Sequence, residues 1–132
     1  MSPSPEEIAF AKKRRILSDS LAPFLASQLQ SDGIQDWSFK NEILTEDGSR
    51  IRENTIKGQR FVFRAKFNTL DEVEHSLILT IAHSQEWLPV VTIESSVGAA
   101  VPTTIITGDL DIAIDDLKQL ISNIFLASKK PH

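Results

Sequence analysis

The chain of 132 residues contains no cysteine and no tyrosine, and it has no long hydrophobic run. Without cysteine, the chain cannot form a disulfide, a thiol nucleophile or a metal site with cysteine ligands. No apolar stretch approaches the roughly 18–20 residues that a membrane-spanning helix needs. The N-terminus also lacks the basic-then-apolar order that is typical of a secretory signal. We therefore expect a cytoplasmic protein that does not bind membranes.

The composition is that of an ordinary globular protein, because 41% of the residues are hydrophobic and 24% are charged. This balance argues against a disordered or low-complexity chain. A length of 132 residues suits one folded domain. We expect a single domain over residues 1–132.

Charge is distributed unevenly along the chain. Residues 1–68 carry 11 Lys and Arg against 9 Asp and Glu, whereas residues 69–132 carry 3 against 9. The two halves therefore have net charges of +2 and −6, which sum to the net charge of −4. Such a split either produces two faces of opposite potential or is neutralised where the two halves pair in one sheet. The strand pattern favours internal neutralisation.

The N-terminal segment has the pattern of an amphipathic helix. Ser4 is a suitable N-cap, Pro5 suits the first helical position, and apolar residues then recur at helical spacing. Residues 31–33 (Ser-Asp-Gly) predict the end of the helix. Because Pro23 removes a backbone donor inside this segment, we expect a kink or two short helices there.

The middle of the chain has the period of two that is typical of strands. Between Gln59 and Phe67, aromatic Phe61, Phe63 and Phe67 alternate with mainly cationic residues, and a turn is expected at residues 68–72. The strands are expected at residues 37–43, 59–67, 73–83, 87–95 and 101–107. The first should end at the turn signal of residues 46–49, and Pro102 restricts the last to a sheet edge or a strand end.

A second helix is expected after Thr107 or Asp109, with acidic residues near its N-terminus, where the helix dipole favours them. The order helix, four to five strands, helix predicts an α+β fold with an antiparallel meander. We expect the helices to pack on the aromatic face of the sheet. The size and the order of elements resemble those of secretion chaperones and similar adaptor domains in layout alone, which carries little functional weight.

The sequence contains no convincing catalytic, cofactor or metal site. His75 and His83 share a strand face but lie eight residues apart, roughly 26 Å, so one ion cannot bind both. Ser95 and Ser96 lack the glycine pattern of a serine nucleophile. The five glycines are scattered and fit no phosphate-binding loop, and the aspartates after Gly108 do not match a calcium loop. We expect no enzyme, no cofactor and no metal.

Two basic elements are candidates for binding. Residues 12–15 (Lys-Lys-Arg-Arg) are typical of nucleic-acid binding or nuclear import, but helical geometry spreads them around the axis and brings at least one near the core. On the strand, Arg60, Arg64 and Lys66 share one face, where a pair between Lys66 and Glu74 would neutralise part of the charge. The aromatics point to the other face, which weakens the nucleic-acid interpretation.

The most consistent hypothesis is a non-catalytic accessory, chaperone-like or regulatory domain that binds another protein. The alternatives are a nucleic-acid-binding regulator that uses residues 12–15 with the cationic strand face, and a small carrier of hydrophobic ligands. The apolar arc of the C-terminal helix is broad, so we expect part of it to remain uncovered and to support a homodimer. The candidate partner-binding residues are Arg60, Arg64, Lys66, Ile112, Leu120 and Phe125.

Overall fold

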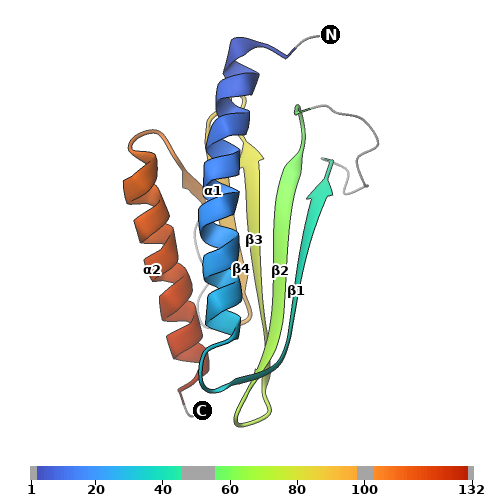
Figure 1. The fold of residues 1–132 in the computed structure, drawn as a ribbon, viewed down its shortest axis with the longest axis vertical. Helices are drawn as coiled ribbons and strands as arrows, with labels where there is room; N and C mark the ends of the chain where they lie inside the picture. The colour runs from blue at the N-terminus through green and yellow to red at the C-terminus, as the bar shows by residue number, and fades with distance from the viewer. Residues whose placement is uncertain (1–2, 46–55, 98–102, 131–132) are drawn as a thin grey trace.

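The computed structural model describes residues 3–45, 56–97 and 103–130. These residues form a five-stranded antiparallel sheet and two helices (Figure 1). The elements are α1 (Pro5–Leu29), β1 (Ile34–Leu44), β2 (Arg60–Thr69), β3 (Glu74–His83), β4 (Pro89–Ser95), β5 (Thr104–Ile105) and α2 (Leu110–Ser128). The strands lie in the sheet in their chain order, so the predicted α+β class and meander are confirmed.

Helix α1 begins as predicted, because the hydroxyl of Ser4 accepts a hydrogen bond from the Glu7 amide (3.2 Å) and Pro5 takes the first helical position. It is not split at Pro23, however, and it runs unbroken to Leu29. The prediction of two short helices is therefore wrong. Pro23 and Asp19 both lie on the exposed side, where water can hydrate the carbonyl that the proline leaves without its helical donor.

The strand boundaries differ from the predicted ones mainly at turns. Strand β1 begins three residues earlier than expected, and its pairing with β2 is interrupted by a bulge between Gln35 and Ser38. Strand β4 begins at Pro89, because Trp87 adopts a positive φ of 62° in the turn that precedes it. The expected turn at residues 46–49 and part of the expected last strand lie outside the described residues. The part of that strand that is described, β5, is two residues long.

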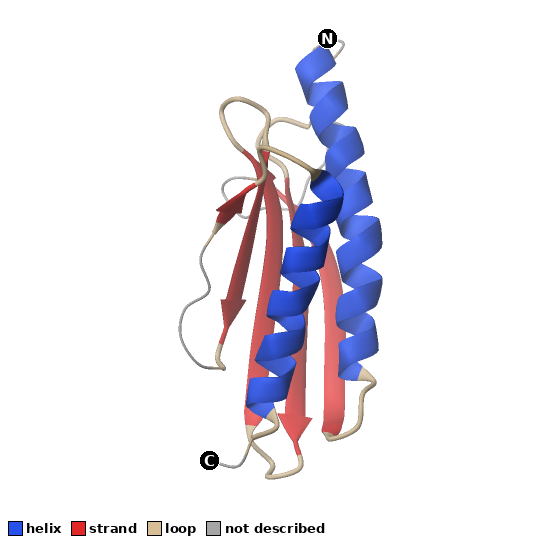
Figure 2. Ribbon diagram, turned by 90° about the vertical axis from the view of Figure 1, so that its left-hand side faces the viewer, coloured by secondary structure: helices blue, strands red, loops and turns tan. Residues whose placement is uncertain are grey.

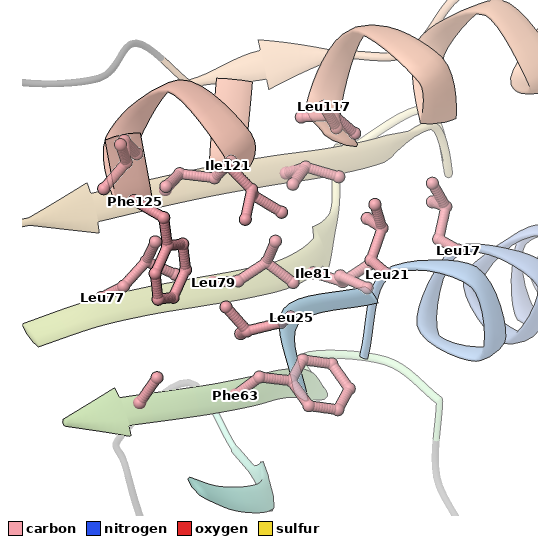
Figure 3. Close-up of a cluster of buried hydrophobic side chains, with 14 of the residues drawn as sticks. Leu17, Leu21, Leu25, Phe63, Leu77, Leu79, Ile81, Leu117, Ile121 and Phe125 are labelled. Atoms are coloured by element: carbon pink, nitrogen blue, oxygen red, sulfur yellow. The ribbon is translucent and has the colours of Figure 1, made fainter. Parts of the chain in front are cut away.

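Both helices cover the same face of the sheet, so the molecule has two layers (Figure 2). The core between the layers is mainly aliphatic (Figure 3). Its buried residues include Leu17, Leu21 and Leu25 of α1, Phe63, Ala65 and Phe67 of β2, Leu77, Leu79 and Ile81 of β3, Val91 and Ile93 of β4, and Leu117, Ile121 and Phe125 of α2. Phe67 stacks on Phe125 with ring centroids 4.7 Å apart, but the surrounding side chains are aliphatic. The expected packing on an aromatic face is therefore not supported.

Helix α2 lies beside α1, and each end is fixed by a polar contact. At its N-terminus, the carboxylate of Asp109 accepts hydrogen bonds from the amides of Asp111 (2.8 Å) and Ile112 (3.2 Å). Beyond its C-terminus, the Lys129 ammonium donates to the Ser31 hydroxyl after α1 (3.0 Å). Neither helix is long and apolar enough, within the described residues, to cross a membrane.

Candidate functional site

The two strand histidines are held by structural contacts. His83 accepts a hydrogen bond at Nε2 from the Gly58 amide (2.8 Å), and its Nδ1 then donates to the Ser84 carbonyl (2.8 Å). Its ring also stacks on Trp87, with centroids 4.1 Å apart. Both ring nitrogens of His83 are thus engaged by the backbone.

His75 lies near the other end of β3 and is buried. Its Nε2 lies 3.4 Å from the Thr69 hydroxyl, and its ring contacts Phe67 with centroids 5.4 Å apart. Within the described ranges, no group of three or more His, Asp or Glu side chains is arranged to hold a metal ion. Ser95 lies opposite Leu77 in the ladder, six residues from His83, which is about 20 Å along the strand. This geometry keeps Ser95 away from His83, and the Ser95 hydroxyl accepts a hydrogen bond from the Val97 amide (3.0 Å).

The basic run of residues 12–15 does not form one cationic surface. Lys12, Lys13 and Arg15 are exposed, but Arg14 is only 8% exposed and lies between α1 and the start of β2. Its guanidinium donates to the Gln59 side chain (3.0 Å). Desolvation by this burial lowers the pKa of Arg14. Arg14 therefore belongs to the interior, and the remaining cations of the run spread around the helix.

The cationic strand face consists of Arg60, Arg64 and Lys66 on the side of the sheet that the helices leave open. Arg60 donates to the Thr45 carbonyl (3.1 Å), and Arg64 forms an ion pair with Glu42 of β1 (3.6 Å). Lys66 is paired in register with Ser76, while Glu74 lies opposite Asn68. Hence β1 rather than β3 supplies the neutralising carboxylate, and the expected pair between Lys66 and Glu74 is not seen. No ion pair between the basic and acidic halves of the chain is among the interactions of the described residues.

The candidate residues of α2 have different environments. Phe125 is 1% exposed and stacked on Phe67, so its side chain is not available to a partner. Ile112 is 61% exposed and Leu120 is half-buried, and both line a shallow groove of about 320 Å³ with Ile105 of β5. Exposed Leu126 lies on the side of Ile112, but the positions between them are polar. Polar positions therefore interrupt the exposed apolar arc of α2. The rest of the apolar surface of α2 is buried in the core or against α1.

A larger groove, with a volume of about 510 Å³, lies between α1 and the edge strand β1. We call it the α1–β1 groove. It is lined by Ser18, Asp19, Ala22 and Pro23 of α1, by Asn41, Glu42 and Ile43 of β1, and by Phe61 and Phe63 of β2. None of these residues was identified as a site from the sequence.

The shape of the α1–β1 groove follows from the packing of α1. The helix packs on the middle of the sheet through Leu17, Leu21 and Leu25 (Figure 3). Strand β1 therefore lies to one side of α1 and is not covered by it (Figure 1). On the flank toward β1, small Ala22 and the short ring of Pro23 leave space above the two phenylalanines. Ile43 remains 47% exposed at the outer wall, although it is apolar. The groove thus offers an apolar surface at the edge of the sheet.

Comparison of the chain with known protein families, with curated protein sequences and with solved structures finds no significant match.

Proposed function

We propose that this protein is a non-catalytic accessory domain that binds an extended, apolar segment of another protein in the α1–β1 groove. The observation that carries the proposal is the groove itself, with Phe61 and Phe63 below and half-exposed Ile43 at its rim. An open groove above an edge strand suits an extended peptide, because the peptide can place alternate side chains in the groove. The hydrophobic surface of two phenylalanines supplies the main driving force.

The charge of the groove indicates which charged residues the bound segment of the partner should contain. Its lining includes the carboxylate of Asp19 and no lysine or arginine, while the carboxylate of Glu42 lies on the open face of the sheet with Arg64. Asp19 has an arginine partner, Arg15, at 3.8 Å, and this pair is solvent-exposed. Exposed ion pairs are weak, so an incoming cation can share the Asp19 carboxylate. We infer a segment in which apolar residues are accompanied by a lysine or arginine, whose charge sets its position in the groove.

Selection of binders from a library of displayed random peptides tests this proposal. The wild-type protein is expected to enrich peptides with alternating apolar residues and at least one basic residue. Ala22→Trp fills the groove and should abolish binding of the enriched peptides. Ala9→Trp is the matched control, since Ala9 is exposed on α1 and does not line the groove. Equal binding to both variants, with both folded by circular dichroism, would contradict the proposal.

The two alternatives are distinguished by direct measurements on the same protein. A nucleic-acid-binding regulator should bind a mixed-sequence oligonucleotide with an affinity that falls steeply as salt rises, because phosphate contacts release counterions. A carrier of hydrophobic ligands should retain a small molecule through purification, which native mass spectrometry detects. The proposal predicts neither result.

A further inference from the structure

Among the residues that the structure describes, strand β1 has a free edge, because it is the first strand of the sheet and pairs with β2 on one side only. Its regular pairing with β2 covers Ser38–Leu44, which follows the bulge. An edge strand exposes a row of backbone donors and acceptors, and natural proteins usually protect or pair such a row. The seven residues after the bulge are long enough to template another strand.

We propose that a second copy of this chain pairs antiparallel with β1 along this edge, in a register centred on Asn41. In this register, Ser38–Leu44 of the two copies overlap completely, and the two sheets join into one. Side chains from the same face of each sheet meet, since in an antiparallel pair opposite residues point the same way. Phe39 therefore lies opposite the partner's Ile43 on the helix-covered face.

The charges of β1 are complementary to those of its own copy. On the open face, Lys40 lies directly opposite Arg64 of β2, and neighbouring like charges of this kind are unfavourable. Glu42 pairs with Arg64, whereas no carboxylate of the described residues forms an ion pair with Lys40. Centring the pair on Asn41 places the partner's Glu42 opposite Lys40, and the same contact occurs twice by symmetry. A second copy thus supplies a carboxylate that the described residues of one chain do not bring to Lys40.

Other registers are less favourable. A residue on the two-fold axis meets its own copy, so an axis at Lys40 or Glu42 would bring like charges together. Asn41 carries both a donor and an acceptor in its side-chain amide, and it can therefore hydrogen-bond to an identical group. The bulge at Gln35–Ser38 restricts registers that extend further toward the start of the strand. The length of the regular part of β1, the charges of Lys40 and Glu42 and the two-fold symmetry thus all favour the register centred on Asn41.

This dimer differs from the one expected through α2, and it goes beyond the proposed function. In it, the helices of both copies cover the same face of one continuous sheet, and the two α1–β1 grooves lie on either side of the joined β1 strands. A partner with two binding segments would then gain avidity. Peptide binding to one groove does not require the second copy, so failure of the dimer and failure of the groove are measured separately.

Charge-reversal variants test the dimer by sedimentation equilibrium at micromolar concentration. The wild type should have a mass of twice 14.7 kDa. Within Ser38–Leu44, Lys40→Glu gives two acids and Glu42→Lys gives two bases, so each variant should weaken its own dimer about tenfold or more in Kd. An equimolar mixture of the two variants should dimerise again, because every pair across the axis is then of opposite charge. This rescue also shows that both variants are folded.

Controls separate this register from a general effect of charge. Lys12→Glu and Glu94→Lys make the same charge changes at exposed positions away from β1 and should leave the dimer unchanged. Asn41→Lys places like charges on the axis without removing the Glu42 carboxylate, and it should give a monomer. The inference is overturned if the wild type is monomeric, if the single variants dimerise like the wild type, if their mixture does not, or if Leu120→Glu on α2 disrupts the dimer instead.

Discussion

The guanidinium carbon of Arg14 lies 4.0 Å from the centre of the Phe61 ring, so a charged side chain of α1 packs on an aromatic ring near the start of β2. Phe10 flanks the same guanidinium at 5.4 Å, and Gln59 accepts one of its hydrogen bonds. The Nε atom is buried and makes no hydrogen bond in the described part of the chain. Arg14 therefore fixes α1 above Phe61, at one end of the α1–β1 groove, but its charge is poorly compensated.

We predict that Arg14→Met leaves the free energy of unfolding unchanged or raises it. The methionine keeps an apolar stem over Phe61 and removes a partly satisfied buried charge. Burial lowers the pKa of Arg14 because it disfavours the charged guanidinium, and the methionine removes this desolvation cost. Arg14→Ala should be about 2–4 kcal/mol less stable than Arg14→Met, since it also leaves a cavity. Urea denaturation measures both, and a Met variant as unstable as the Ala variant would contradict this account.

Phe63 lies in the core beneath α1, and Phe63→Ala should lower the free energy of unfolding by about 3–5 kcal/mol. That loss would unfold a domain of marginal stability. Leu70→Ala is the control, because Leu70 is 74% exposed and its loss should change stability by less than about 0.5 kcal/mol. A urea midpoint for Phe63→Ala equal to that of the wild type would show that this face is not the core.

His83 is predicted to contribute to stability and not to catalysis. His83→Ala leaves the Gly58 amide without its acceptor and removes the stacking on Trp87, which should lower the free energy of unfolding by about 1–3 kcal/mol. The emission of Trp87 should change at the same time. A reaction found in an activity screen and abolished by His83→Ala or His75→Ala, with the fold intact by circular dichroism, would refute the non-catalytic assignment.

Glu42→Gln should change the free energy of unfolding by less than about 1 kcal/mol, although it removes the ion pair with Arg64. Both side chains are partly exposed, at 36% for Glu42 and 45% for Arg64, so water screens their attraction. Thermal unfolding in low and high salt measures the effect, which should shrink as salt rises. A loss of several kcal/mol would mean that this pair holds β1 to the sheet.

The sequence predicts the elements well where a local pattern determines them. The alternation from Phe61 to Phe67 identifies β2, and Ser4 with Pro5 identifies the start of α1, because strand period and helix capping depend on neighbouring residues. The split at Pro23 was wrongly predicted, since the effect of the proline depends on whether water reaches the Asp19 carbonyl. The start of β4 was misjudged because the positive φ of Trp87 is rare for such a residue and has no signal in the sequence.

The candidate site could not be predicted in the same way. Ala22 and Ile43 lie far apart in the chain, and they line one groove only because α1 crosses the middle of the sheet and β1 lies beyond it. Trp37, Phe39 and Ile43 did predict a strand, but not that Ile43 would remain exposed at an edge. Burial of Phe125 likewise depends on Phe67, which is a tertiary contact. Local patterns assign elements, whereas a groove depends on how the elements are placed.

The most direct test of the proposed function is to map the binding of a selected peptide by the chemical shifts of the protein's backbone amides. Our account predicts that the largest changes occur around Ala22, Ile43 and Phe61, and that the changes disappear in Ala22→Trp but persist in Ala9→Trp. Changes centred on Ile112 and Leu120 of α2, or on Arg64 and Lys66 of the open sheet face, would contradict the assignment of the α1–β1 groove as the binding site.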